Sequence, residues 1–180
     1  MNITIRRGVP ADAVSLADLA ARTFHDTFAA DSQPGDMALH LTQAYGPLQQ
    51  GRELADPNVA TLLVDADDQL VGYAQIRGGP APPCVDGDAP IELWRFYFAR
   101  EWHGRGLAQT LMQRVDAEAR RTDARTLWLG VWERNERAKA FYRKCSFVDV
   151  GAHVFMVGSD AQTDRILVRA VAPVAMTDPL

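Results

Sequence analysis

The sequence contains little of what would mark a disulfide-rich, metal-binding or nucleic-acid-binding protein. Only two of its 180 residues are cysteines, Cys84 and Cys145. They form no CxxC spacing, so we expect neither a disulfide framework nor a metal site. Basic residues are not in excess either, because 19 Lys and Arg stand against 23 Asp and Glu. This balance argues against a sequence-independent nucleic-acid binder, which needs a basic face.

Long apolar runs are also missing. No run approaches the roughly 18 residues of a membrane span, and the N-terminal MNITIRRGVPAD lacks the apolar core of a signal peptide. The length and the 47% apolar content suit one domain that buries roughly 70% of its unfolded surface. We therefore expect a reduced, cytoplasmic protein with no membrane partner. Its single domain should cover residues 1–171, and residues 172–180 should form a loose tail.

Hydrophobic periodicity predicts a chain in which strands and helices are mixed. Strands are expected at residues 2–6, 61–65, 70–77, 91–98, 126–132, 147–157 and 165–171. Helices are expected at residues 10–28, 36–45, 107–119 and 134–144. Three glycines and four prolines between Gly78 and Pro90 predict a long loop there. Because hairpins alternate with crossovers, the expected class is α/β (α+β), with a mixed sheet covered by helices.

The most informative segment is the glycine-rich turn Gly104-Arg105-Gly106, which follows a strand and opens an amphipathic helix. A helix N-terminus presents unpaired N–H groups and a positive dipole, which together bind pyrophosphate. The segment is not a P-loop, since no Gly-Lys-Ser/Thr follows, and it lacks the GxGxxG dinucleotide fingerprint. Two glycines alone do not decide between a phosphate site and a closely packed helix start.

Two blocks of the sequence resemble the GNAT superfamily of acyl-CoA-dependent N-acetyltransferases. The sequence HGRGLA at residues 103–108 resembles the phosphate motif Q/R-x-x-G-x-G/A, with His103 where Gln or Arg is usual. The sequence NERAKAFYRKCSF at residues 135–147 follows N-x-x-A-x-x-F-Y-x-x-x-G-F, with Ser146 in place of glycine. We expect that serine to strain the turn into the next strand. The resemblance covers nearly the whole chain. Together with further segments, DPN at residues 56–58, ELWR at 92–95, WLGVWE at 128–133, and GAHVF at 151–155 through QTD at 162–164, it looks like the bacterial spermine/spermidine-type branch.

The resemblance implies a fold, a cofactor and a cofactor site. The fold is a GNAT-like, mostly antiparallel sheet of about seven strands flanked by about four helices. The cofactor is acetyl-CoA, used as a co-substrate without a metal. Six consecutive residues would bind its pyrophosphate: His103, Gly104, Arg105, Gly106, Leu107 and Ala108.

The cofactor arm would be held by the preceding strand and by the following helix. In this family that strand carries a bulge whose free N–H and C=O groups pair with the pantetheine arm, and the matching positions are Phe96, Tyr97 and Phe98. Without the family, Phe96 and Phe98 would be core residues. Asn135 would hold the same arm, and its alternative role is the N-cap of the helix that follows.

Two residues match the family's positions for proton transfer. Tyr142 matches the general acid that protonates the departing thiolate, and its alternative role is packing with a hydrogen bond. Glu92 matches the glutamate base of histone-acetylating members. A carboxylate on an apolar strand is costly unless it is paired or used, so an ion pair with Arg95 or another basic residue is the alternative. Ordered water could also serve as the base.

A cationic acceptor should be met by carboxylates. Besides Glu92 the candidates are Asp26, Asp31, Asp86 and Asp88, although the last two are explained more simply as keeping a loop soluble. His25, His40 and His153 are weaker candidates for the acceptor side. Cys145 is better explained as a small buried filler than as a nucleophile, so no acyl-cysteine route is expected.

The function implied is transfer of the acetyl group of acetyl-CoA to a primary amine by direct attack within a ternary complex. The acceptor expected is a small cationic amine such as a polyamine. Two alternatives remain: a protein or peptide N-acetyltransferase, and a regulatory module that binds acyl-CoA without catalysis. The presence of both Tyr142 and Glu92 argues against the module. A homodimer is compatible with the resemblance.

Overall fold

The structure is a computed structural model that describes residues 2–29, 34–157 and 160–171. Its strands are β1 (Ile3–Arg7), β2 (Val59–Ala66), β3 (Gln69–Arg77), β4 (Pro90–Phe98), β5 (Thr126–Trp132), β6 (Val148–Val157) and β7 (Asp160–Ala170). Its α-helices are α1 (Ala13–Phe28), α2 (Pro34–Tyr45), α3 (Pro47–Ala55), α4 (Leu107–Arg121) and α5 (Glu136–Lys144). Short 3₁₀ turns at Pro10–Asp12 and Arg100–Trp102 precede α1 and α4.

The described strands form one seven-stranded sheet in the order β1-β2-β3-β4-β5-β7-β6. Each neighbouring pair is antiparallel except β4 and β5, which run parallel. Their pairing is short, because it joins only residues 90–92 to residues 126–128. Beyond these residues the two strands separate. The expected mixed, mostly antiparallel sheet is therefore confirmed, and it contains an opening in its middle.

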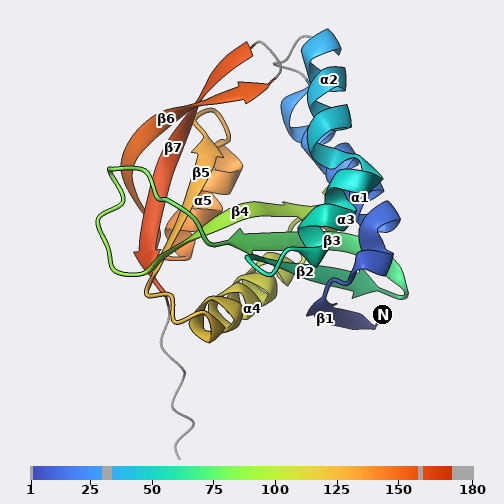
Figure 1. Ribbon diagram of the computed structural model, residues 1–180, viewed down its shortest axis with the longest axis horizontal. Coiled ribbons are helices and arrows are strands. Elements are labelled where there is room, and N and C mark those ends of the chain that lie inside the picture. Colours follow the sequence, from blue (N-terminus) through green and yellow to red (C-terminus); the bar gives the residue numbers. More distant parts are fainter. Residues whose placement is uncertain (1, 30–33, 158–159, 172–180) are drawn as a thin grey trace, which may run out of the picture.

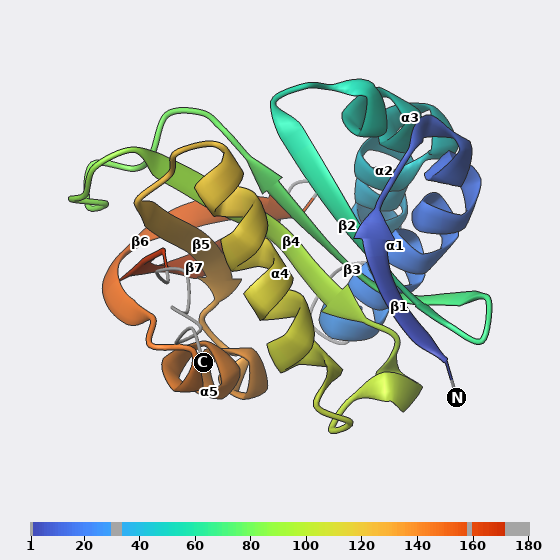
Figure 2. The ribbon, with the colours of Figure 1, turned by 90° about the horizontal axis from the view of Figure 1, so that it is seen from below.

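Two hydrophobic cores lie on opposite faces of the sheet. Strand alternation divides β2 between them: Leu62 and Val64 pack with Leu111 of α4, whereas Leu63 packs with Leu16 of α1. Figure 2 shows α4 crossing the near face of the sheet, with α1, α2 and α3 beyond β1 and β2. In Figure 1, β6 and β7 rise on one side of β4 and α2 rises on the other. The opening between β4 and β5 therefore lies between β6 and β7 on one side and α2 on the other.

The expected elements are found within about three residues of their predicted limits, except that β7 begins at Asp160 and not at residue 165, and one helix comes in addition. The sequence analysis took Gly46-Pro47 only as the end of a helix. Pro47 is also the first residue of α3, where its fixed φ and missing N–H are compatible with a new helix. The turn expected at residues 158–160 lies largely outside the described residues, as does the tail at residues 172–180. None of the described helices combines the length and apolar content needed to cross a membrane.

Candidate functional site

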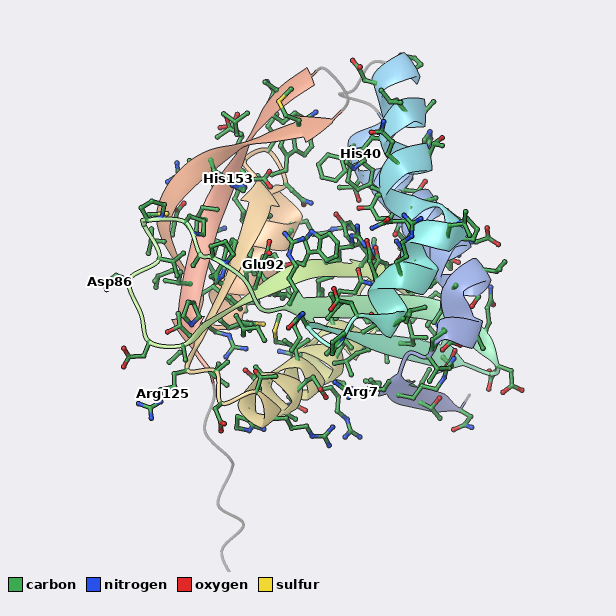
Figure 3. The ribbon with its side chains drawn as sticks, in the orientation of Figure 1. Arg7, His40, Asp86, Glu92, Arg125 and His153 are labelled. Carbon is green, nitrogen blue, oxygen red and sulfur yellow. The ribbon has the colours of Figure 1, made fainter. Side chains whose placement is uncertain are left out.

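A cavity of about 270 Å³ occupies the place where β4 and β5 separate. Its walls come from α1, α2, β3, β4, β5, α5, β6 and β7, so it receives side chains from both ends of the chain. We call it the acceptor cavity. Figure 3 shows Glu92 on β4 below this space, with His40 of α2 and His153 of β6 on opposite sides of it.

Glu92 lies on the wall of the acceptor cavity, where it is paired with a cation. Its Oε2 accepts a hydrogen bond of 2.5 Å from Nε of Arg77 on β3, the strand beside it. The guanidinium of Arg77 also stacks over Trp94, 3.9 Å from the ring centre. The ion-pair alternative for Glu92 is thus present, with Arg77 rather than Arg95 as the partner.

Arg95 also lines the acceptor cavity and belongs to a second, almost fully buried network. Its Nη1 donates to Oε2 of Glu53 at 2.5 Å and to the side-chain carbonyl of Gln75 at 2.8 Å. Tyr45 and Trp94 cover the faces of its guanidinium. The pair is almost fully buried, so both charges have been removed from water at a cost in free energy, and these contacts offset that cost. They also fix the floor of the acceptor cavity.

A bulge in β4 is present and is centred on Trp94. Gln75 of β3 pairs with Arg95, whereas the next residue, Ile76, pairs with Leu93, so Trp94 is the extra residue. After Glu92, β4 has no pairing with β5 among the described residues. The edge of β4 that faces β5 therefore has no strand partner along the predicted arm-binding residues, Phe96, Tyr97 and Phe98, and the Phe98 carbonyl is bound there by the His103 ring. The bulge lies two residues before the first of them.

The glycine-rich turn adopts the backbone conformation that its glycines permit. Gly104 and Gly106 have φ of +76° and +79°, and no atom lies within 4 Å of a Cβ built at either position. Gly106 is the N-cap of α4, and no side chain caps this helix start. The free N–H groups of the first turn therefore meet an open groove of about 200 Å³. We call it the cradle groove. It is lined by all six predicted pyrophosphate residues: His103, Gly104, Arg105, Gly106, Leu107 and Ala108.

The ring of His103 makes two contacts that fix its proton. Arg137 of α5 places Nη1 2.5 Å from Nδ1 of His103, and a guanidinium can only donate. Nδ1 is therefore the acceptor, and Nε2 carries the hydrogen that is donated to the Phe98 carbonyl at 3.0 Å. Burial, followed by the charge of Arg137, lowers the pKa of His103 and keeps it neutral. The neutral ring of His103 therefore adds no charge to the cradle groove but contacts Arg137, which lines the groove together with Arg105.

Tyr142 lies where the two hollows meet. It lines the acceptor cavity and the cradle groove, as do Phe96 and Ala138. Its ring packs against Phe141 at 5.4 Å and Phe147 at 5.5 Å. Burial raises the pKa of Tyr142 well above its usual value, so the phenol keeps its proton at neutral pH.

Asn135 has the capping role that the sequence analysis gave as its alternative. Its Oδ1 accepts a hydrogen bond of 3.1 Å from the N–H of Ala138 and so closes the first turn of α5. The same side chain lines the acceptor cavity and a third hollow of about 290 Å³, which reaches Asp26 and His103. Capping leaves the amide NH₂ of Asn135 for other partners.

The candidate acceptor carboxylates are spread over different places. Asp26 is exposed and lines the third hollow. Asp31 lies outside the described residues. Asp86 and Asp88 are exposed, and their loop packs against β5 and β6 rather than the acceptor cavity (Figure 3). Asp86 lines a different hollow, together with Asp116 and Arg169. Of these four, therefore, no described residue lines the acceptor cavity.

The three candidate histidines and Cys145 also lie in different places. His25 is exposed on α1, whereas His40 and His153 line the acceptor cavity. Burial, followed by the charge of Arg95, lowers the pKa of His40, which stacks on Phe24 at 4.6 Å. Burial raises the pKa of the Cys145 thiol, which disfavours the nucleophilic thiolate.

Three site residues were not identified from the sequence. Arg137 lies inside the second motif block at a position that the motif leaves free, so its charge gave no signal. Arg77 and Asp164 belong to strands distant in sequence from both blocks. Asp164 lines the acceptor cavity from β7 and lies opposite His153 of β6. Only the register of β6 and β7 brings these two residues together.

Comparison with known proteins agrees with this geometry. A protein-family model described as the acetyltransferase (GNAT) family matches residues 18–147. An uncharacterised N-acetyltransferase of Lactobacillus delbrueckii subsp. lactis is 33% identical over 153 residues, which is 85% of this chain and 88% of that protein. An aminoglycoside N(6′)-acetyltransferase type 1 of Stenotrophomonas maltophilia is 29% identical over 156 residues, covering 84% and 90% of the two chains.

The solved structures agree as well. PaiA N-acetyltransferase of Thermoplasma acidophilum, crystallised in complex with coenzyme A, has a TM-score of 0.74 to this chain. The match covers 94% of this chain and 99% of that chain at 20% identity. At this identity the likeness concerns the fold.

Proposed function

The chain belongs to the acetyltransferase (GNAT) family and is an acetyl-CoA-dependent N-acetyltransferase, and we propose that its acceptor is a small cationic amine such as a polyamine. The observation that carries this proposal is the junction at Tyr142. A groove with a helix N-terminus meets a cavity with carboxylates on its wall, and Tyr142 lines both. Two reactants bound in these hollows would meet beside a phenol that keeps its proton.

The residues of the cradle groove fit the pyrophosphate of acetyl-CoA. The free N–H groups at the start of α4 and the guanidinium of Arg137 both favour an anion there. The open edge of β4 after the Trp94 bulge, at residues 96–98, would pair with the amide groups of the pantetheine arm. When bound, acetyl-CoA supplies the thioester that carries the acetyl group.

We propose Glu92 as the group that prepares the acceptor. An alkylammonium has a reference pKa near 10.4 and must lose a proton before its nitrogen can attack the thioester carbonyl. The ion pair with Arg77 fixes the Glu92 carboxylate at the cavity wall. There it would attract the ammonium group and take up this proton, directly or through water. A second proton leaves the nitrogen as the amide forms.

Tyr142 is the proposed acid. The departing sulfur needs one proton, so of the two that the amine loses, one is released in each turnover. Burial keeps the proton on Tyr142 but also makes the phenol a weak acid. We therefore propose that the O–H donates a hydrogen bond to the sulfur, and that the proton moves only as negative charge develops there.

We further propose that the enzyme works in the cytoplasm, as a homodimer of one domain per chain. Both cysteines are free, which is usual in a reducing compartment. β6, an edge of the sheet, exposes Val148, Val154 and Met156 to solvent. A second copy could cover this apolar edge.

The test is release of coenzyme A thiol from acetyl-CoA with a panel of polyamines, aminoglycosides, amino acids and peptides. We expect spermidine or spermine to be acetylated, with KM rising as salt screens the attraction. The likeness to an aminoglycoside acetyltransferase favours a second candidate function, since aminoglycosides are also polycationic amines. Turnover of aminoglycosides alone would establish that candidate. Turnover of a peptide N-terminus without any small amine would overturn the proposal.

A further inference from the structure

We propose that Asp164 of β7 anchors a second ammonium group of the acceptor, so that the acceptor cavity selects molecules with two or more cationic centres over monoamines. This inference rests on the proposed function and names the residue that would give it specificity. It concerns a carboxylate for which neither of the two sequence motifs has a counterpart.

Charge pairing in the acceptor cavity leaves Asp164 as the carboxylate that still needs a cation. Glu92 is bound by Arg77 at 2.5 Å, and Arg95 is bound by Glu53 at the same distance. Among the described residues, the basic side chain beside Asp164 is that of His153, with Nε2 3.8 Å from Oδ2, too far for a hydrogen bond. Oδ1 of Asp164 is buried and has no hydrogen-bond partner in the described part of the chain.

A carboxylate in this position is costly to the protein until a cation arrives. Burial raises the pKa of Asp164 to about 6, although His153 opposes the shift. The group is therefore charged at neutral pH in an environment that disfavours its charge. An ammonium group would satisfy it with charge-assisted hydrogen bonds, which contribute more than neutral ones. The cost already borne by the free protein makes Asp164 a strong partner for such a ligand.

The strand opposite lets the carboxylate lie close to the backbone of β5. Gly130 of β5 lines the acceptor cavity, and a Cβ built there would lie 3.0 Å from Oδ2 of Asp164 and 3.2 Å from Nε2 of His153. The Asp164 carboxylate and the His153 ring therefore lie over residue 130, in positions that a side chain there would crowd. Any larger residue would displace the carboxylate from the wall of the acceptor cavity.

The sheet register separates Asp164 from Glu92 by a distance that suits a diamine. Glu92 pairs with Trp128, whereas Asp164 pairs with Trp132, four residues further along β5. That offset is about 13 Å along the strand, and the Asp164 carboxylate shortens it to about 7 Å by reaching back over Gly130. One amino group could thus meet Glu92 while another, three or four carbons away, meets Asp164.

The inference makes binding depend on pH with a definite sign. Below about pH 6 Asp164 takes up a proton and loses its charge, so the KM for a diamine should rise as pH falls through this value. Other ionisable groups face the same cavity from the elements around it: His153 of β6, Glu92 and Arg95 of β4, Arg77 of β3, His40 of α2 and Tyr142 of α5.

The experiment compares 1,4-diaminobutane with butylamine, which differ by one ammonium group. For Asp164→Asn we expect kcat/KM for the diamine to fall about 10- to 100-fold, as for the loss of a charged hydrogen bond, while the value for butylamine stays within about twofold. The rise in diamine KM below pH 6 should disappear. Calorimetric binding of the diamine to the enzyme saturated with coenzyme A should weaken by the same factor. Asp149→Asn is the matched control, because Asp149 pairs with Arg165 on the neighbouring strand outside the cavity.

A second variant tests the position of the carboxylate without replacing it. Gly130→Ala should raise the KM for the diamine and leave the KM for acetyl-CoA unchanged. If wild-type enzyme acetylates both amines and Asp164→Asn lowers both equally, or neither, the anchor is refuted and the proposed function stands. If wild-type enzyme neither acetylates nor binds any small amine, the proposed function fails and this inference fails with it.

Discussion

The cradle groove and the acceptor cavity lie on either side of Tyr142 and are built in different ways. The cradle groove is made mainly of backbone from one short stretch of chain, residues 103–108, with one cation added by α5. The acceptor cavity is made of side chains from eight helices and strands. Its charged groups are held by partners distant in sequence, as in the pairs of Glu92 with Arg77 and of Arg95 with Glu53.

Because of this difference, the two hollows should respond differently to substitution. A groove formed by N–H groups and glycines depends on backbone conformation, which few substitutions can supply. A cavity lined by side chains changes its specificity when single residues change. We therefore expect variants of the cradle groove to affect acetyl-CoA with every acceptor, and variants of the acceptor cavity to affect some amines and spare others.

The largest effect is expected at the junction. Tyr142→Phe removes the hydroxyl proposed to protonate the departing sulfur and keeps the ring that packs with Phe141 and Phe147. We expect kcat to fall by about 10²- to 10⁴-fold with little change in either KM, because the proton is needed only as the sulfur departs. Steady-state kinetics at saturating substrates would measure this.

Tyr73→Phe is the control for that variant. Tyr73 is as buried as Tyr142 but belongs to the core between β3 and α1. Its kcat should stay within about twofold of wild type. Near-normal turnover of Tyr142→Phe would assign the acid to another group or to water.

A smaller and more selective effect is expected on the cofactor side. Gly106→Val puts a branched side chain on a residue with φ of +79°, which costs about 1–2 kcal/mol, and projects it into the cradle groove. We expect the KM for acetyl-CoA to rise at least about tenfold with every acceptor, while the KM for the amine changes little. Calorimetry with coenzyme A would measure the binding directly.

Gly35→Val makes the same chemical change at a glycine of α2 that has no atom within 4 Å and no positive φ. This control should leave coenzyme A binding unchanged. Unchanged affinity in folded Gly106→Val would remove the helix start from the cofactor site.

Most helices and strands and the glycine-rich turn of the cradle groove could be predicted from the sequence because they depend on local patterns, whereas the seven-stranded, mostly antiparallel sheet was predicted from the family resemblance. β5 has the limits that its apolar run predicts, and the helix after Gly106 begins where the glycine-rich turn ends. α3 escaped detection because Pro47 stops one helix and starts another, and the same residue types give both signals. The helix before α3 and the strand after it were predicted, although α3 itself was not.

The acceptor cavity could not be derived in the same way. Arg77 meets Glu92, and His153 meets Asp164, through pairing between strands, and register is a property of the assembled sheet. The role of His103 shows a second limit. Its place in the motif predicted a contact with phosphate, but its two ring nitrogens are bound to Phe98 and Arg137. The motif located His103, but the contacts of its ring with Arg137 of α5 and Phe98 of β4 are seen only in the structure.

The smallest effect is expected at the turn that joins the helix of Tyr142 to the strand of His153. Ser146 has φ of +66°, as expected from its place where the family motif has glycine, and this conformation is strained for a residue with a Cβ. Ser146→Gly should stabilise the protein by up to about 1 kcal/mol, offset in part by the greater entropy of unfolded glycine, and raise Tm by about 2–4 °C at most. Ser15→Gly, at an exposed position of α1, should instead lower Tm, because glycine is a poor helix former. Because the turn lies outside both hollows, Ser146→Gly should leave kcat and both KM values unchanged. A lower Tm would mean that the serine side chain stabilises the turn by more than its backbone costs.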